Sequence, residues 1–321
     1  MKRILLTGGA GFIGSTLAEK LLNEGHHLTV IDNFSNFYDP DIKEKNIIPL
    51  LRFSTFKLHR MDIVDHDALF QNIGKHDVII HIAAKAGVRP SILDPFGYEE
   101  VNVKGTINLL EFAKHHGIKQ FVFASSSSVY GTNPNVPWIE NSQIDHIISP
   151  YAGSKRSGEI QGKIYSHLYD IRFIALRLFT VFGPKQRPDL AIHKFTKLIL
   201  QDKAITLYGK GNTIRDYTYV DDIVNAFCNA INFTESNFEI INIGNNKPIS
   251  LIQLVGLLEN TFEIKPKIIF EKEQPGDVPK TYADINKAKK LLGYKPQTSI
   301  KEGLEKFKKW VLENQAIVYG K

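Results

Sequence analysis

The sequence predicts an α/β protein, with a doubly wound, mostly parallel sheet and a smaller C-terminal substrate-binding lobe. Two observations support this class. Short apolar runs alternate with helix-like segments through residues 1–184. The first run, Ile4-Leu5-Leu6, is followed at once by Gly8, Gly11 and Gly14 in the spacing G-x-x-G-x-x-G. A strand, a glycine-rich turn and a helix in this order begin a βαβ unit, so we expect a parallel core.

The glycine spacing also predicts a dinucleotide site. One glycine permits the tight turn, one lets backbone amides approach a pyrophosphate, and one lets the helix pack closely on the strand. The helix of residues 15–23 leads to a second strand, 28–31, which ends in Asp32. An acidic residue there accepts hydrogen bonds from the adenosine ribose, which favours NAD over NADP. A glycine triplet alone is a weak signal, but this whole order is typical of a Rossmann fold.

The next two predicted strands, 53–58 and 78–82, each end in residues that suit a cofactor. Asp62 follows the first and either accepts a hydrogen bond from the adenine amino group or caps the helix through residues 68–70. The second runs into Ala83 and Ala84, whose small side chains let a cofactor lie against the backbone. Lys85 and Arg89 follow, and they either contact an anion or cover the loop at the surface.

Four serines follow the fifth predicted strand, 121–124, which comes after a helix over 101–115. A serine run is more often an ordinary loop than a catalytic element. This run lies at the carboxyl end of a strand, where open parallel sheets place their ligands. We therefore include Ser125–Ser128 in the candidate site.

Tyr151 and Lys155 are four residues apart in a segment that enters a helix extending to about residue 169. On a helix they share a face, so their polar ends can converge. A nearby ammonium, or a positive nicotinamide ring, favours the phenolate and is expected to lower the pKa of Tyr151, which then acts as a base. The alternative is an ordinary surface pair, and the preceding motifs favour the catalytic interpretation.

The pattern changes after a sixth predicted strand, 173–178. From Lys185 onward, loops and short helices carry many cations and aromatic residues, with Arg187 and Arg215 available for phosphate or carboxylate. One strand, 239–243, returns to the sheet pattern. We therefore divide the chain into a cofactor-binding domain, 1–184 with a returning strand near 238–244, and a mainly substrate-binding lobe, 185–321.

The composition limits the function classes. The chain has 321 residues, of which 43% are hydrophobic and 23% charged, as in an ordinary soluble protein. The net charge of +6 is dispersed, which argues against nucleic acid as a partner. We expect no membrane span and no signal peptide, because the N-terminus enters a strand directly. The single cysteine, Cys228, is expected to be a core residue and fits a cytoplasmic location.

Five motifs carry a resemblance that covers essentially the whole chain. They are Thr7–Gly14, Ser125–Gly131, Tyr151–Lys155, Arg215–Asp222 and Pro275–Val278. Together they resemble the extended short-chain dehydrogenase/reductase superfamily in its nucleotide-sugar epimerase branch, most closely the UDP-glucuronate 4-epimerases. The cofactor contacts that the motifs and this resemblance imply are Gly8, Gly11, Phe12, Ile13, Gly14, Asp32, Asn33, Asp62, Ile63, Ala83, Ala84, Lys85, Asn102, Tyr151 and Lys155.

The resemblance implies an isomerase that inverts C4 of a UDP-sugar through a 4-keto intermediate, with NAD held tightly and no metal. Tyr151, aided by Ser126, removes the O4 proton, and Lys155 holds the nicotinamide ribose. The expected substrate is UDP-glucuronate, which becomes UDP-galacturonate. UDP-glucose and UDP-N-acetylglucosamine remain alternatives, as does a non-catalytic NAD-binding regulatory protein. Family members often form homodimers through a four-helix interface, which here would use residues 101–115 and 151–169.

The expected substrate contacts are Arg89, Ser127, Ser128, Thr180, Arg187, Arg215 and Asp277. The resemblance assigns the uronate carboxylate to Ser127, Ser128 and Thr180, with Arg187 as a further candidate. Related dehydratases and decarboxylases carry acidic residues where this chain has Ser127 and Ser128, which argues against elimination chemistry. Gln274 stands where UDP-galactose epimerases usually have a phosphate-binding arginine, so we expect Arg215 to take that contact.

Overall fold

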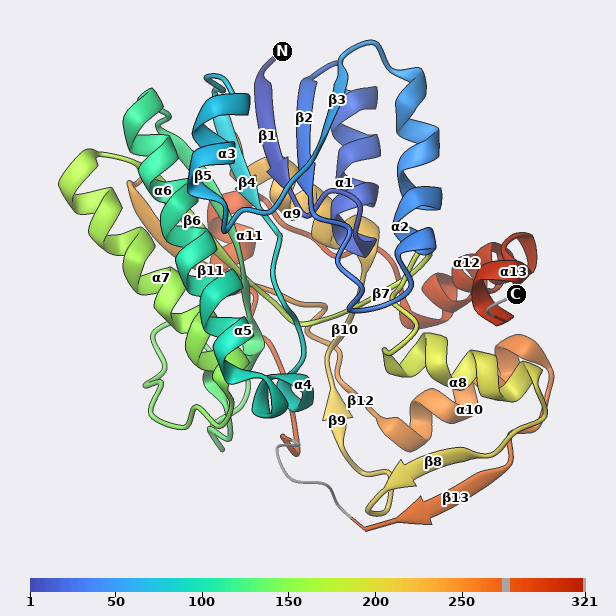
Figure 1. Ribbon diagram of the computed structural model, residues 1–321. Helices are drawn as coiled ribbons and strands as arrows, with labels where there is room; N and C mark the ends of the chain where they lie inside the picture. Colours follow the sequence, from blue (N-terminus) through green and yellow to red (C-terminus); the bar gives the residue numbers. More distant parts are fainter. Residues whose placement is uncertain (273–277, 320–321) are drawn as a thin grey trace.

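Seven parallel strands form the central sheet of the computed structural model, which describes residues 1–272 and 278–319 (Figure 1). Their order across the sheet is β11-β6-β5-β4-β1-β2-β3, and every neighbouring pair is parallel. The bounds are β1 Arg3–Thr7, β2 His27–Asp32, β3 Phe56–Arg60, β4 Val78–His81, β5 Gln120–Ser126, β6 Arg172–Leu178 and β11 Phe238–Ile243. The predicted doubly wound α/β class is confirmed.

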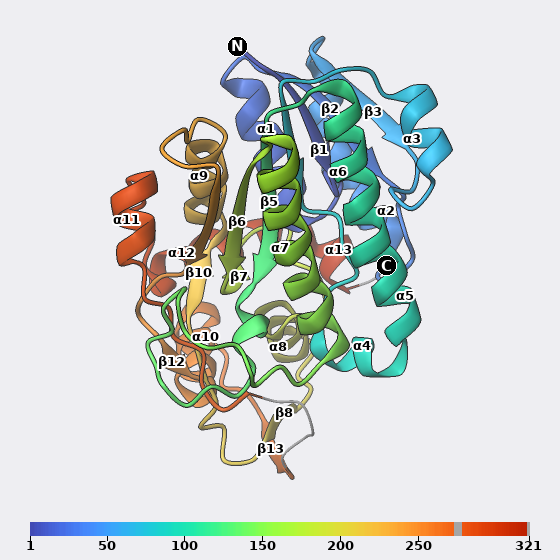
Figure 2. The ribbon, with the colours of Figure 1, turned by 90° about the vertical axis from the view of Figure 1, so that its left-hand side faces the viewer.

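Helices cover both faces of this sheet (Figure 2). Successive strand residues point to opposite faces, so Leu5 packs into a different core cluster from Ile4 and Leu6. One face carries α3, α6 and α7, and the other carries α1 and α9. The bounds are α1 Phe12–Asn23, α2 Pro40–Ile47, α3 His66–Asn72, α6 Gly105–His116, α7 Pro150–Tyr169 and α9 Val220–Ala230.

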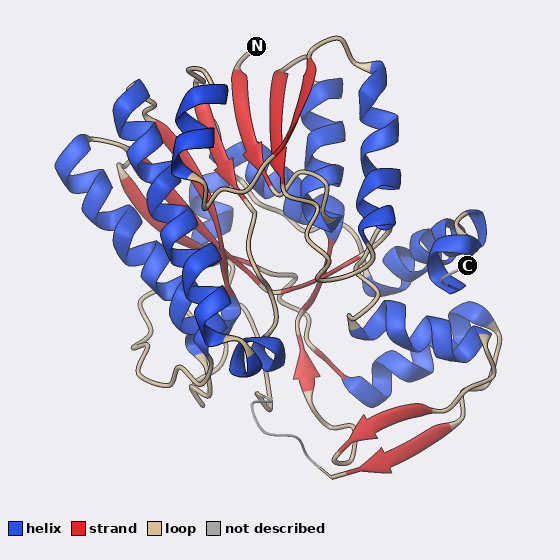
Figure 3. Cartoon of the chain, in the orientation of Figure 1, coloured by secondary structure: helices blue, strands red, loops and turns tan. Residues whose placement is uncertain are grey.

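Most of the other elements lie below the carboxyl ends of the strands (Figure 3), whereas α11 packs beside β11 and α9. Two short helices, α4 Val88–Leu93 and α5 Pro95–Glu99, follow β4. Three two-stranded sheets pair β10 with β7, β12 with β9, and β13 with β8. The strand bounds are β7 Thr180–Phe182, β8 Ile205–Tyr208, β9 Ile214–Arg215, β10 Tyr217–Tyr219, β12 Ile249–Ser250 and β13 Ile268–Glu271. The remaining helices are α8 Ala191–Leu200, α10 Leu251–Phe262, α11 Asn286–Leu292, α12 Ile300–Glu313 and α13 Gln315–Tyr319.

Local departures from the sequence prediction have physical causes. The helix expected over 101–115 begins as a π-helical turn, Glu100–Lys104, before α6. The strand β13 was not predicted, because its residues are mostly exposed and show no alternation of buried and exposed positions. Among residues 1–272 and 278–319, no helix has the length and apolarity needed to cross a membrane.

The switch point of the sheet lies between β1 and β4, where the strand order reverses direction. Gly8 has φ of +74°, and a Cβ there would come within 2.7 Å of the Ala83 nitrogen. A Cβ on Gly14 would come within 2.0 Å of the Gly8 carbonyl oxygen. Both glycines therefore permit backbone segments to approach each other at the edge where the cofactor site was predicted.

Replacing Gly14 with Ala should destabilise the fold by about 1–3 kcal/mol, because the new methyl group meets backbone that cannot move independently of α1. Gly256→Ala is the matched control, since Gly256 lies in α10 and nothing stands within 4 Å of its added Cβ. That change should be neutral or stabilise by up to about 1 kcal/mol through helix propensity. Urea unfolding measures both, and equal effects would contradict this account of Gly14.

Candidate active site

A cavity of about 410 Å³ opens at the carboxyl ends of the central strands. It is lined by the glycine-rich turn, the ends of β2 and β5, the start of α7 and the loop before α8. The predicted residues that line it are Gly8, Gly11, Phe12, Ile13, Gly14, Asp32, Asn33, Asp62, Ile63, Ala83, Ala84, Lys85, Ser126, Ser127, Ser128, Tyr151, Lys155, Thr180 and Arg187. Residues from distant parts of the sequence are thus brought to one cavity.

The glycine-rich end fits a dinucleotide. Asp32 is buried and accepts hydrogen bonds from the backbone nitrogens of Ala10, at 3.0 Å, and Phe34, at 2.9 Å. These bonds fix a carboxylate in the cavity wall at the end of β2, where a ribose is expected. The Lys43 Nζ lies 3.7 Å from Asp32, and burial lowers the pKa of Lys43 while Asp32 opposes this change. Lys43 was not predicted, because it lies in a polar helix without a recognisable motif.

Asp62 lies in the same wall and does not cap a helix. Its carboxylate accepts hydrogen bonds from Asn33 Nδ2, at 2.7 Å, and from the Val64 nitrogen, at 3.0 Å. The cap of α3 is Asp65, which accepts from the Ala68 nitrogen at 2.9 Å. The capping alternative for Asp62 was therefore wrong, and Asp62 stays a candidate for contact with the adenine.

Asn102 supports the cavity from behind. Its side chain accepts from the Lys85 nitrogen at 2.8 Å, donates to the Lys85 carbonyl at 2.9 Å and donates to Ser154 Oγ at 2.9 Å. These bonds tie the segment after β4 to α7. Asn102 is absent from the lining, so within the described residues it positions Lys85 instead of facing the cavity. The Lys85 ammonium itself pairs with Asp94 at 2.5 Å.

Tyr151 faces the end of β5 and forms a hydrogen bond with Ser126. Burial raises the pKa of Tyr151 above its usual value, while Ser126 and the charge of Arg187 act in the opposite direction. The prediction that this pKa is lowered is therefore wrong, because burial is the largest effect on Tyr151. The Lys155 ammonium donates to the Ala124 carbonyl at 2.8 Å and lies 4.9 Å from the centre of the Phe123 ring.

Hydroxyls and a guanidinium also line the cavity. Ser127, Ser128 and Thr180 line it together with Arg187. The Arg187 Nε and Nη2 donate to the two carboxylate oxygens of Asp189 at 2.9 and 2.7 Å. Its guanidinium carbon lies 5.2 Å from the centre of the Phe37 ring.

Two predicted substrate contacts lie elsewhere. Among the described residues, Arg89 and Arg215 do not line the cavity. The Arg89 guanidinium lies over the Tyr208 ring at 5.0 Å, and Arg215 Nη1 donates to the Ile214 carbonyl at 2.9 Å. Asp277, like Gln274, falls in 273–277, outside the described residues.

A glycine-rich turn at a switch point, an acid after β2 and a serine–tyrosine–lysine set define an extended short-chain dehydrogenase/reductase. The chain belongs to the GDP-mannose 4,6 dehydratase family, whose model matches residues 5–307. It is 40% identical over 318 residues to a UDP-glucuronate 4-epimerase of Thermodesulfobacterium geofontis, covering 98% of this chain and 97% of that one.

Two solved structures extend the comparison. The UDP-glucuronic acid 4-epimerase of Bacillus cereus, in complex with UDP-glucuronic acid and NAD, has a TM-score of 0.90 and 38% identity. The match covers 97% of this chain and 99% of that one. The UDP-glucose 4-epimerase of Thermotoga maritima, with UDP-glucose, has a TM-score of 0.89 and 31% identity, with 98% and 99% covered.

Burial lowers the pKa of Lys155 to about 7, although the charge of Glu159 opposes this shift. Between this value and 10.5 the unfolded chain binds the proton and the folded chain does not, so stability should rise with pH across this window. The Lys155→Met variant should lack this rise in stability with pH. The stability of the variant relative to the wild type should therefore be greatest below pH 7 and fall by a few kcal/mol toward pH 10, since one pKa unit corresponds to about 1.36 kcal/mol.

Urea unfolding of protein stripped of nucleotide, at pH 6 and pH 10, checks this expectation. Lys301→Met, at an exposed position of α12, controls for the general effect of removing a positive charge. A difference between Lys155→Met and wild type that stays constant with pH would contradict the lowered pKa.

Proposed function

We propose that this protein is an NAD-dependent isomerase that inverts C4 of a UDP-sugar, converting UDP-glucuronate into UDP-galacturonate. The observation that carries the proposal is the convergence of the Tyr151–Ser126 pair and the dinucleotide cradle on one cavity. The similarity to UDP-glucuronate 4-epimerases across nearly the full length of both chains supports the same conclusion.

The described residues fit NAD, because the wall around Gly8 and Gly14 has no room for side chains and Asp32 stands at the ribose end. When bound, NAD would supply the acceptor for a hydride from C4 and the donor for its return to the opposite face of the sugar. Tyr151 removes the O4 proton in the first step and returns it in the second, with Ser126 hydrogen-bonded to the phenol. Lys155 stands one helical turn from Tyr151 and is placed to hold the nicotinamide ribose.

The hydroxyl-rich end of the cavity favours a uronate. Ser127, Ser128 and Thr180 offer neutral donors for a carboxylate, and Arg187 adds a charge. A 4-keto uronate is a β-keto acid, so a carboxylate held in a fixed orientation also protects it from loss of carbon dioxide. Elimination chemistry needs an acid to protonate the leaving group, and neither Ser127 nor Ser128 supplies one at neutral pH.

Neutral and N-acetylated UDP-sugars are the second candidates. The Thermotoga maritima structure, a UDP-glucose 4-epimerase, shares the fold of this chain over nearly its full length. The elements after residue 184 form mainly the proposed substrate lobe, apart from β11 and from α9, which covers the central sheet, and Arg215 is a candidate for the diphosphate. A cytoplasmic location is proposed on the lone buried thiol of Cys228.

Wild-type protein incubated without added NAD should convert UDP-glucuronate to UDP-galacturonate, because the cofactor is regenerated in each cycle and need not leave. Tyr151→Phe should bind NAD normally and lose turnover by about 100-fold or more, since the proton acceptor is gone. NMR of the products, with UDP-glucose and UDP-N-acetylglucosamine in parallel, checks both expectations.

Each alternative result has a definite meaning. Conversion of the neutral sugars alone would reassign the substrate and dismiss the carboxylate contacts. Retained epimerisation in Tyr151→Phe would exclude this residue as the base. NAD binding without conversion of any sugar would favour a regulatory protein.

We also propose a homodimer that pairs through α7. Three apolar side chains four residues apart, Ile160, Ile164 and Leu168, form an exposed stripe on this helix. Leu93 and Phe96, on the short helices α4 and α5 that pack against α7, are 88% and 87% exposed. Such a stripe suits a two-fold interface in which the same helix of each subunit meets its copy.

The double change Ile164→Glu with Leu168→Glu should convert the dimer to a monomer, because four charges would be buried without partners across a two-fold interface. Ile48→Glu is the control, since Ile48 is an exposed apolar residue that directly follows α2, and α2 lies on the opposite side of the molecule from α7 (Figure 1). Light scattering after gel filtration measures the mass. A monomeric wild type, or a double variant that stays dimeric, would contradict the interface.

A further inference from the structure

Three consecutive residues at the end of β5 each make a polar contact with a residue on one face of α7. The strand contributes the three consecutive residues 124–126, and the helix contributes three residues spaced by four. The bonded pairs are Lys155 Nζ to the Ala124 carbonyl at 2.8 Å, Ser125 Oγ to Glu159 Oε1 at 2.6 Å, and Tyr151 with Ser126. The position of the helix along the strand therefore determines the geometry of the proposed catalytic pair.

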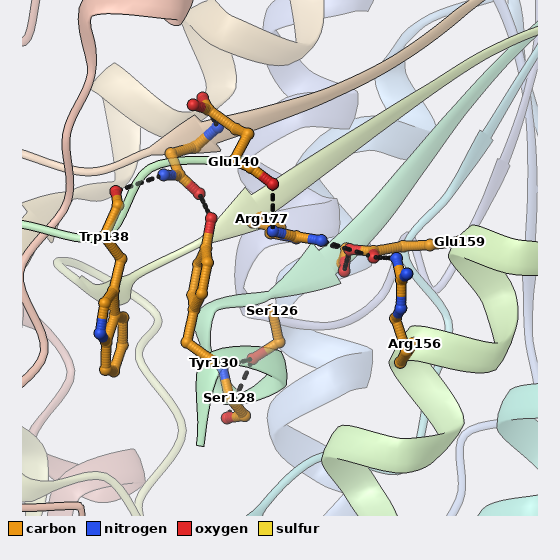
Figure 4. A network of polar contacts seen from close by, with 10 residues as sticks. Ser126, Ser128, Tyr130, Trp138, Glu140, Arg156, Glu159 and Arg177 are labelled. Carbon is orange, nitrogen blue, oxygen red and sulfur yellow. Dashed lines mark hydrogen bonds and ion pairs between the residues drawn. The ribbon is translucent and has the colours of Figure 1, made fainter. Parts of the chain in front are cut away.

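Glu159 also pairs with two arginines (Figure 4). Its side chain is fully buried, and Arg177 of β6 donates to its two oxygens from Nε and Nη2, each at 2.8 Å. Arg156, which is partly exposed, donates to Oε2 at 2.9 Å. Burying a carboxylate and a guanidinium removes both from water, so such a pair contributes little net stability compared with apolar residues. A role in the site would explain the pair better than stability does.

We infer that Glu159 is a positioning residue of the active site, which holds the end of β5 in place against α7 and supplies the negative charge that Lys155 faces. The inference rests on the proposed epimerase function. Ser125, the residue before Ser126, connects Glu159 to the end of β5, because its hydroxyl donates a hydrogen bond to Glu159.

The charges around Lys155 support the electrostatic part of this role. Glu159 raises the pKa of Lys155 against the larger effect of burial, which leaves it at about 7. Tyr151 stands one turn away on α7, and His81 of β4 also interacts with the ammonium. Burial together with Lys155 lowers the pKa of His81 well below its usual value. His81 is therefore neutral, and Glu159 is the nearby group that favours a protonated Lys155.

The test is Glu159→Gln, which retains the shape and an oxygen acceptor for Ser125 but removes the charge. The kcat should fall by about tenfold or more, because the reacting groups are displaced. KM should change by a smaller factor, because Thr180 and Arg187 lie outside β5 and α7. Activity should also fall at high pH as Lys155 loses its proton, and this alkaline limb of the kcat profile should move down by about one pH unit in the variant. Arg156→Gln is the matched control and should leave kcat and this limb within about twofold of wild type.

Ser125→Ala tests the same link in a chain that keeps the ion pair. It should lower kcat at unchanged KM and leave the alkaline limb in place. A folded Glu159→Gln protein with wild-type kcat and pH profile would overturn the inference. If Glu159→Gln does not fold, an unchanged kcat in Ser125→Ala would overturn it instead.

A readout without turnover separates this inference from the proposed function. In protein stripped of nucleotide, the pH at which stability begins to rise should move from about 7 to a lower value in Glu159→Gln. A wild type that converts no UDP-sugar would defeat the proposed function, and this shift would still support the coupling of Glu159 to Lys155. If stability begins to rise at the same pH in Glu159→Gln as in the wild type, the coupling of Glu159 to Lys155 is overturned, whatever the activity.

Discussion

The close packing of α7 on the sheet is the constraint on which the site depends. A Cβ at Gly158 would come within 2.5 Å of the Phe123 ring, and one at Gly162 would come within 2.2 Å of the Phe173 ring. The two glycines thus let aromatic side chains of β5 and β6 pack directly against the helix backbone. Because α7 is this close, the proposed base can meet the end of β5 without a long side chain or an intervening loop.

Burial also shifts the pKa values of charged groups around the cavity. Two buried lysines line the cavity, and each feels a nearby carboxylate: Lys43 lies beside Asp32 at the ribose end, and Lys155 feels the charge of Glu159, which stands behind the cavity wall. Burial lowers the pKa of both lysines, and the carboxylate opposes the change in each case. A dinucleotide brings its own charges into a wall whose cations and anions are already fixed in position, so little reorganisation is needed when it binds.

The parts of this site that could be predicted from the sequence depend on short spacings. Gly8, Gly14 and Asp32 belong to one βαβ unit, and Tyr151 with Lys155 to one helical turn, so local patterns identify them. Glu159 and Lys43 escaped prediction, because their partners come from other elements. The predicted lowering of the Tyr151 pKa was wrong, because this pKa depends on burial, which the spacing of residues cannot reveal. The capping alternative for Asp62 was also wrong, because Asp65 caps α3. Periodicity predicted a mostly parallel central sheet, and its seven strands are all parallel, whereas the exposed strand β13 had no such signal.

In the proposed reaction, different parts of the fold set the chemistry and the choice of sugar. The proposed roles of Tyr151, Lys155 and the end of β5 concern C4 of a hexose whatever its C5 substituent, which agrees with the fold that this chain shares with uronate and glucose epimerases. Discrimination between sugars would then depend on Ser127, Ser128, Thr180 and Arg187. A guanidinium carries five N–H donors, and two of those of Arg187 already bind Asp189. A substrate carboxylate must share this arginine with an acid that largely neutralises it, so recognition of a uronate depends as much on three neutral hydroxyls as on charge.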